Sequence, residues 1–138
     1  ADMKKAADIC INAKMRRVGI CGAAETLLID QTINSKDMSE IIKKLLDSGC
    51  EVRGTDIIAA CDNRVVPATD ADWGCEFLAP IIAVKTVSGL DEAIAHIRLN
   101  SSGHTESIIT EDMAEAETFL NEIVFLGYTN LLKSGFFI

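Results

Sequence analysis

The sequence predicts an α/β protein with a mainly parallel, open sheet and flanking helices. Amphipathic helical segments alternate with short apolar runs, which is the pattern of strand-helix-strand units. The run Pro-Ile-Ile-Ala-Val at 80–84 does not alternate apolar with polar residues, so it suits a strand covered on both faces. Of the 138 residues, 49% are hydrophobic and 25% are charged, which fits one packed domain.

Two helices are predicted in the first third of the chain from apolar residues at i, i+3, i+4 and i+7. In the first, over 2–14, this spacing turns Cys10 toward the core. The second begins at Asp37, with Glu40 as its capping-box partner, and ends at Gly49.

Two more helices and four strands are predicted further along. Ser88 with Asp91 opens the third helix, and Thr110 caps the fourth. The strand-like runs are Thr26–Ile29, Ile57–Ala60, Ile81–Val87 and Ser107–Thr110.

Charge and hydropathy exclude two classes of partner. The net charge of −8 is opposite to what a nucleic-acid binder needs to neutralise phosphates. No apolar run approaches the roughly 20 residues that span a bilayer, and the first residues lack a secretory pattern. We therefore expect no nucleic acid and no membrane as partners, and a soluble, cytoplasmic protein.

The cysteines and histidines give no support for a metal. The five cysteines, at 10, 21, 50, 61 and 75, form an odd set without a CxxC pair, so they are predicted to be reduced thiols. His96 and His104 have no metal-ligand spacing with them. We expect no metal, and a solvent-facing or hydrogen-bonded structural role for His96.

Cys21 stands out because glycines flank its turn, Gly-Ile-Cys-Gly at 19–22, and an expected helix start follows it. Backbone N–H groups at a helix start could stabilise a thiolate and a nearby oxyanion. Arg16 and Arg17 would add positive charge, and the glycines would let a substrate approach the sulfur. The alternative, a buried and inert cysteine, is the commoner case.

Three segments carry a resemblance to a known family. They are "NAKMRRVGICGAAETLLI" (12–29), "DADWGCEFLAPIIAVKTV" (70–87) and "LDEAIAHIRLNSSGHTESIITEDMAEAETFLNEI" (90–123). Together, in this order, they resemble the γ-glutamyl phosphate reductases (glutamate-5-semialdehyde dehydrogenases) of the aldehyde dehydrogenase superfamily. The resemblance implies a fold of the aldehyde dehydrogenase catalytic-domain type.

The resemblance also implies roles for single residues. Cys21 takes the place of the nucleophile, and Glu76, in "CEFLAP", that of the glutamate that holds the nicotinamide ribose. Gly22 and His104 are substrate-side candidates, the latter within a stretch similar to the family's "GSxHTE". A polar loop that merely caps the following strand is an equal alternative for that stretch.

The implied reaction belongs to proline biosynthesis. The Cys21 thiolate would attack L-glutamyl 5-phosphate, a small acyl phosphate, and expel phosphate. NADPH would then reduce the thioester, and glutamate 5-semialdehyde would leave.

The chain also departs from the family pattern. We expect a catalytic domain at 1–123, a divergent apolar tail at 124–138, and no N-terminal cofactor domain. The tail is either a replaced ending, from a frameshift or degraded gene, or an ordinary terminal strand or helix. Little turnover is then expected unless another chain supplies the cofactor domain. The alternative function is a non-catalytic remnant or self-associating module, and a homo-oligomer is possible in either case.

Overall fold

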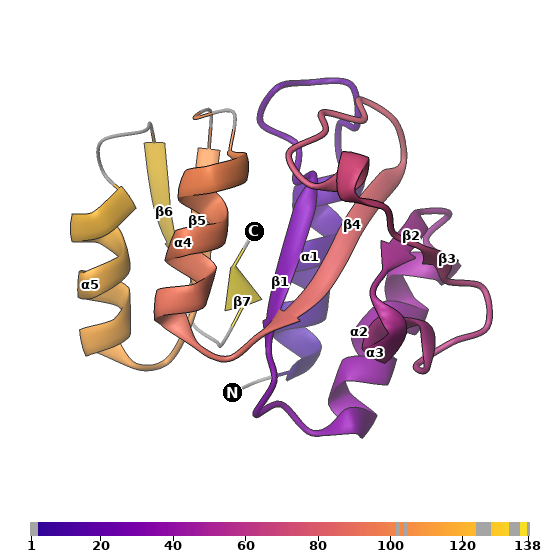
Figure 1. Ribbon diagram of the computed structural model, residues 1–138, viewed down its shortest axis with the longest axis horizontal. Coiled ribbons are helices and arrows are strands. Elements are labelled where there is room, and N and C mark those ends of the chain that lie inside the picture. The colour runs from indigo at the N-terminus through magenta and orange to yellow at the C-terminus, as the bar shows by residue number, and fades with distance from the viewer. Residues whose placement is uncertain (1–2, 102, 104, 124–127, 133–135, 138) are drawn as a thin grey trace.

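One seven-stranded sheet organises the molecule in the computed structural model, which describes residues 3–101, 103, 105–123, 128–132 and 136–137 (Figure 1). The strand order is β3-β2-β4-β1-β7-β5-β6. The strands are β1 (Thr26–Asp30), β2 (Glu51–Gly54), β3 (Val66–Pro67), β4 (Ile81–Val87), β5 (Thr105–Ile109), β6 (Tyr128–Leu132) and β7 (Phe136–Phe137). The helices are α1 (Met3–Met15), α2 (Ser35–Asp47), α3 (Asp56–Ala59), α4 (Leu90–Asn100) and α5 (Met113–Ile123), with a 3₁₀ turn, η1 (Asp70–Asp72).

The sheet is mainly parallel, as predicted. The pairs β3–β2, β2–β4, β4–β1 and β5–β6 are parallel, and β7 runs antiparallel to both neighbours, β1 and β5. The apolar tail thus contributes two strands to the sheet by its backbone, β6 beside β5 and β7 between β5 and β1. Residues 124–127, 133–135 and 138 of that tail lie outside the described residues.

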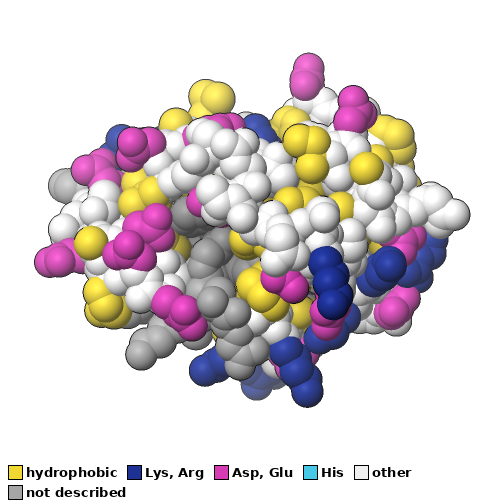
Figure 2. Space-filling model, turned by 90° about the horizontal axis from the view of Figure 1, so that it is seen from below, with side chains coloured by type: hydrophobic (Ala, Val, Ile, Leu, Met, Phe, Trp, Pro, Cys, Tyr) yellow, Lys and Arg dark blue, Asp and Glu magenta, His cyan; other side chains and the backbone are white. Residues whose placement is uncertain are grey.

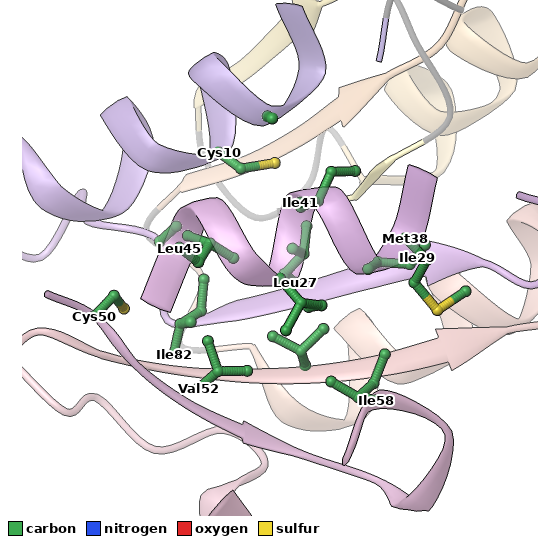
Figure 3. Close-up of a cluster of buried hydrophobic side chains, with 14 of the residues drawn as sticks. Cys10, Leu27, Ile29, Met38, Ile41, Leu45, Cys50, Val52, Ile58 and Ile82 are labelled. Atoms are coloured by element: carbon green, nitrogen blue, oxygen red, sulfur yellow. The ribbon is translucent and has the colours of Figure 1, made fainter. Parts of the chain in front are cut away.

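Helices cover both faces of the central strands. Leu27 and Ile29 of β1 join a cluster under α1 and α2 (Figure 3), whereas Leu28 points into a second cluster with α4 and α5. In β4, Ile82 and Val84 likewise join the first cluster, whereas Val87 joins the second. Burial on two faces explains why these strands read as continuous apolar runs, so the prediction for β4 is confirmed.

The strand predicted at Ile57–Ala60 is wrong. Residues 56–59 form the short helix α3, with Ile58 buried and Ile57 exposed. The position beside β4 belongs to the preceding residues, because β2 pairs in parallel with 81–84. Two adjacent isoleucines mimic a strand, whereas the true strand, Glu-Val-Arg-Gly, carries one large apolar residue.

The predicted start of α2 needs a correction. Asn34, not Asp37, caps this helix, since the Asp37 N–H donates to Asn34 Oδ1 at 3.0 Å. Asp37 lies in the first turn, where a carboxylate favours the positive end of the helix dipole.

The predicted starts of α4 and α5 also differ from the structure. At α5, Asp112 Oδ1 accepts the backbone N–H groups of Ala114 and Glu115, at 2.8 and 3.2 Å. Thr110 instead accepts the Asp112 N–H at 3.0 Å. At α4, Gly89 occupies the cap position.

Charge is unevenly distributed over the molecule. Residues 90–123, which include α4, β5 and α5, contain eight acidic residues and one basic residue. Acidic side chains accordingly stand out on the left of Figure 2, the side of α4 and α5, while most Lys and Arg lie to the right. Among the described residues, no helix is long and apolar enough to cross a membrane.

Candidate active site

A cavity of about 120 Å³ lies where the turn before β1 meets the loop before β4, the end of α4 and the start of β5. It sits at the amino ends of parallel strands, opposite to the edge where doubly wound sheets usually bind ligands. Its polar and thiol-bearing lining residues are Cys21, Glu25, Thr26, Cys75, Glu76, His96, Asn100, Ser101, Thr105, Glu106 and Ser107, with Gly22 beside them. Cys21, Gly22 and Glu76, singled out in the sequence, therefore share one cavity.

Cys21 lies in a turn, not before a helix. The Ala23 N–H donates to the Ile20 carbonyl at 3.1 Å, which places Cys21 and Gly22 at the two central positions of the turn. Both are exposed. The predicted helix start is wrong because the Ala24 N–H donates to the carbonyl of Ala13, at the end of α1, and the chain then enters β1.

The expected basic neighbours of the sulfur do not line the cavity. Arg16 and Arg17 are exposed and are absent from the lining, which among the described residues contains no Lys or Arg. Charge assistance from this pair therefore loses its support. Access to Cys21 rests on the exposure of the turn itself.

The Glu76 loop packs closely on the end of α4. Gly74 has φ +80°, and a Cβ at this position would lie 2.6 Å from the Asn100 carbonyl oxygen. Only glycine fits both the backbone conformation and this approach. The contact places Cys75 and Glu76, which follow in sequence, beside the cavity.

An ion pair anchors the start of the same loop. Asp72 is buried and accepts the backbone N–H of Thr69 at 2.7 Å and the Arg53 guanidinium at 2.8 Å. These two contacts, the backbone hydrogen bond first, hold the pKa of Asp72 below its usual range. Arg53 also lies 5.2 Å above the ring of Phe77.

A buried ion pair anchors the end of the loop. Lys14 has no exposed surface and its Nζ is 2.7 Å from Glu25 Oε2, while Glu25 Oε1 accepts the Leu78 N–H at 3.4 Å. Leu78 has φ +50°, which is unusual for a bulky residue and typical of functional loops. Glu25 thus connects the Cys21 turn with the Glu76 loop.

His96 lines the cavity and is not purely solvent-facing. Its ring meets Trp73 edge-on, with ring centroids 5.6 Å apart, and its Nδ1 is 3.4 Å from the Asn100 amide nitrogen. Burial lowers the pKa of His96, which favours the neutral imidazole. Its buried Nε2 has no hydrogen-bond partner among the described residues.

Glu106, on β5, is a half-buried acid of the cavity. The Ser101 hydroxyl donates to its Oε1, and the Gly103 N–H donates to Ser101 Oγ at 2.8 Å. Burial raises the pKa of Glu106 above its usual range.

The substrate-side candidate His104 lies outside the described residues. Its neighbour Thr105 does approach the cysteine turn, because a Cβ added at Gly22 would lie 4.0 Å from Thr105 Oγ1. The structure thus brings Thr105, at the start of β5, close to the cysteine turn.

The remaining cysteines differ from Cys21. Cys10 and Cys50 are at most 2% exposed, and burial raises the pKa of their thiols to about 12 and about 11. Cys61 is partly buried, with its Sγ 3.6 Å from the Ile57 carbonyl oxygen. Of the five, only Cys21 is exposed.

Comparisons with known proteins identify relatives of the chain. It is 52% identical over 123 residues to the γ-glutamyl phosphate reductase of Afipia carboxidovorans, and 50% identical to that of a Bradyrhizobium species. The match covers 89% of this chain in both cases. The chain is homologous to γ-glutamyl phosphate reductases. It spans 29% and 28% of the length of these two relatives, and no protein-family model matches it.

Solved structures agree in fold. The γ-glutamyl phosphate reductase of Thermotoga maritima superposes with a TM-score of 0.89 at 42% identity, over 98% of this chain and 32% of the reductase. The Saccharomyces cerevisiae reductase gives 0.67 at 25% identity, over 98% and 34%. An acetylating aldehyde dehydrogenase from Geobacillus thermoglucosidasius gives 0.68 at 19% identity, over 98% and 38%, which supports the fold alone. The expected α/β catalytic-domain fold is confirmed.

Sequence reasoning missed several polar residues of this reductase-like cavity, four of which matter most here. Glu25, Asn100, Ser101 and Glu106 are brought together only by the packing of β1, α4 and β5. A partial signal existed for Glu106, the last residue of the Gly-His-Thr-Glu stretch. No local pattern marks the other three.

Proposed function

We propose that residues 1–123 are the cysteine-bearing catalytic part of a γ-glutamyl phosphate reductase, an NADPH-dependent enzyme of proline biosynthesis. The proposed reaction converts L-glutamyl 5-phosphate into glutamate 5-semialdehyde and phosphate. The observation that carries the proposal is that exposed Cys21 and Glu76, which are distant in sequence, line one cavity.

The first step is acyl transfer to the Cys21 sulfur. The thiolate attacks the γ-acyl carbon, a C–S bond forms, and the C–O bond to phosphate breaks with its electron pair leaving on phosphate. Thiolate is suited to this step because it is a strong nucleophile and leaves readily from carbonyl adducts. The exposed turn provides an open approach to the sulfur.

Oxyanion stabilisation is assigned to the backbone of the same turn. The turn's own hydrogen bond uses the Ala23 N–H, not the N–H of Cys21. The Cys21 N–H is therefore our candidate donor to the developing oxyanion. Loss of one such donor typically reduces the rate on the order of 100- to 1,000-fold.

One residue of the cavity, Glu76, is suited to bind the nicotinamide ribose of the cofactor. Glu76 is exposed at the cavity and lies within a loop clamped at both ends, so its carboxylate can accept hydrogen bonds from ribose hydroxyls. NADPH, when bound, supplies the hydride that reduces the thioester. We propose that a further segment or partner chain completes the cofactor site, because the described cavity offers no Lys or Arg side chain for the cofactor phosphates.

The acylation step can be tested on this chain without cofactor. L-Glutamyl 5-phosphate should release phosphate in step with an acyl adduct on the Cys21 peptide, identified by mass spectrometry and removed by hydroxylamine. Cys21→Ser should lack the thioester, whereas the matched variant Cys61→Ser should keep it. An adduct spread evenly over the cysteines, or none above the Cys21→Ser background, would contradict the proposal.

A further inference from the structure

The charged side chains that line the described cavity are three glutamates, and they differ in partner or in proposed role. Glu25 is paired with the buried Lys14, and Glu76 is assigned above to the cofactor ribose. Glu106 remains, and the described part of the cavity holds no Lys or Arg side chain beside it. A partly desolvated carboxylate without a cation favours a ligand that brings one.

Glu106 is also held in place. The hydrogen bond from Ser101 engages Oε1, and the Gly103 N–H fixes the Ser101 hydroxyl at 2.8 Å. This arrangement orients the carboxyl without neutralising it, and Oε2 is not needed for the Ser101 contact. Burial raises the pKa of Glu106, so a cation beside this carboxylate would offset the cost of its charge.

The surroundings of the cavity have the matching sign. Glu25, Glu76 and Glu106 line the cavity, and no Lys or Arg is among the described lining residues. A cationic group of a ligand is therefore favoured beside the Glu106 carboxylate.

We propose that Glu106 binds the α-ammonium group of the substrate and makes the Cys21 cavity selective for acyl compounds that carry an amino group. This inference rests on the proposed function and deepens it. In a γ-glutamyl group, four single bonds of about 1.5 Å separate the amine from the reacting carbon, so that they can lie roughly 5 Å apart. One cavity of about 120 Å³ can thus hold both ends of that chain.

A structural role alone is the competing explanation, since Glu106 also closes the α4–β5 connection through Ser101. Charge-selective labelling separates the two. We would measure, by peptide mapping, the rates at which Cys21 reacts with aminoethyl and with sulfonatoethyl methanethiosulfonate, a cation and an anion. Cys61, outside the cavity lining, is the internal reference.

Glu106→Gln should lower the cation-to-anion rate ratio at Cys21 on the order of tenfold, the size expected for one nearby charge in a partly solvated site. Glu106→Asp should retain most of the preference. The matched control Glu117→Gln removes an exposed charge on α5 and should leave the ratio unchanged. Should Cys21 resist all reagents, Cys75 reports on the same cavity.

Binding of the amino group is tested by protection. High concentrations of L-glutamine should slow labelling of Cys21 by neutral methyl methanethiosulfonate, whereas glutaramate, which lacks only the amino group, should not. Glu106→Gln should abolish the difference. Equal effects of the two compounds on the original chain, or an unchanged charge ratio in Glu106→Gln, would overturn the inference. Failure of the proposed function has a different signature, since then no acyl adduct forms on Cys21.

Discussion

The apolar core under α1 and α2 and the cavity before β1 both contain cysteines, in opposite settings. In the core, Cys10 and Cys50 are sealed, and burial raises the pKa of their thiols to about 12 and about 11. At the cavity, Cys21 is exposed and Cys75 partly so.

The contrast shows that packing, not residue type, decides which thiol can react. With a pKa of about 12, fewer than about one Cys10 thiol in ten thousand is ionised at pH 7.5. A cysteine placed in a turn avoids this desolvation. Four substitutions can break or sharpen the comparison.

The largest loss of stability is expected from a substitution at the buried Lys14, where the core and the cavity meet. Lys14→Met leaves Glu25 partly buried without its cation, so the free energy of unfolding should fall by about 3–5 kcal/mol. Urea denaturation measures this. Lys44→Met, which breaks an exposed pair with Glu40, should cost about 0.3–0.5 kcal/mol. Equal losses of unfolding free energy in Lys14→Met and Lys44→Met would contradict the claim that the buried pair stabilises the fold more than the exposed pair.

The second effect concerns the cavity side alone. Gly74→Ala combines an unfavourable φ with a clash against the Asn100 carbonyl, and should reduce stability by about 3 kcal/mol. Gly49→Ala is the control, because Gly49 has φ +88° but open space around its Cβ position. It should lose only about 1–2 kcal/mol. Denaturation midpoints compare the two, and a larger loss for Gly49→Ala would show that close packing of the Glu76 loop is not the cause.

A smaller effect is expected on the core side. Asn34→Ala removes the cap of α2 and should reduce stability by about 1 kcal/mol. The labelling rate of Cys21 should stay as it is, since α2 does not line the cavity. A changed rate would mean that the two regions are coupled more tightly than their separate packing indicates.

The smallest effect depends on pH. Because the folded-state pKa of Glu106 is raised, protonated Glu106 favours folding below about pH 4.3, and this contribution disappears as pH rises through the folded-state value. Glu106→Gln should therefore match the original chain in stability near pH 4 and exceed it at pH 7.5. Urea denaturation at both pH values checks the sign, and a variant less stable at pH 7.5 would contradict it.

Much of the fold could be predicted because its signals are local. Two-sided burial makes β1 and β4 continuous apolar runs, and the spacing of Ile41, Ile42 and Leu45 marks the buried face of α2. Helix caps were misplaced because several polar residues compete within one turn, as Asn34 and Asp37 do. The helix α3 resembles a strand in sequence because its two isoleucines are apolar neighbours, although only Ile58 is buried.

The site was less predictable. Cys21 has a local signal, its glycine-flanked turn, whereas Glu76 was identified only through the family resemblance. Glu106 belongs to the cavity because β5 and the end of α4 meet the cysteine turn, and that meeting has no local sequence signature. Arg16 was expected to add positive charge near the Cys21 sulfur. It does not line the cavity, because closeness in sequence to Cys21 does not decide where its side chain lies.

Competitive labelling of the five thiols in the folded chain tests the central claim most directly. At neutral pH, limiting iodoacetamide followed by peptide mapping should modify Cys21 first, ahead of Cys61, and on the order of 1,000-fold faster than Cys10 and Cys50, which depend on opening of the core. If Cys21 reacts no faster than Cys50 or Cys61, its assignment as the accessible nucleophile of the cavity is contradicted.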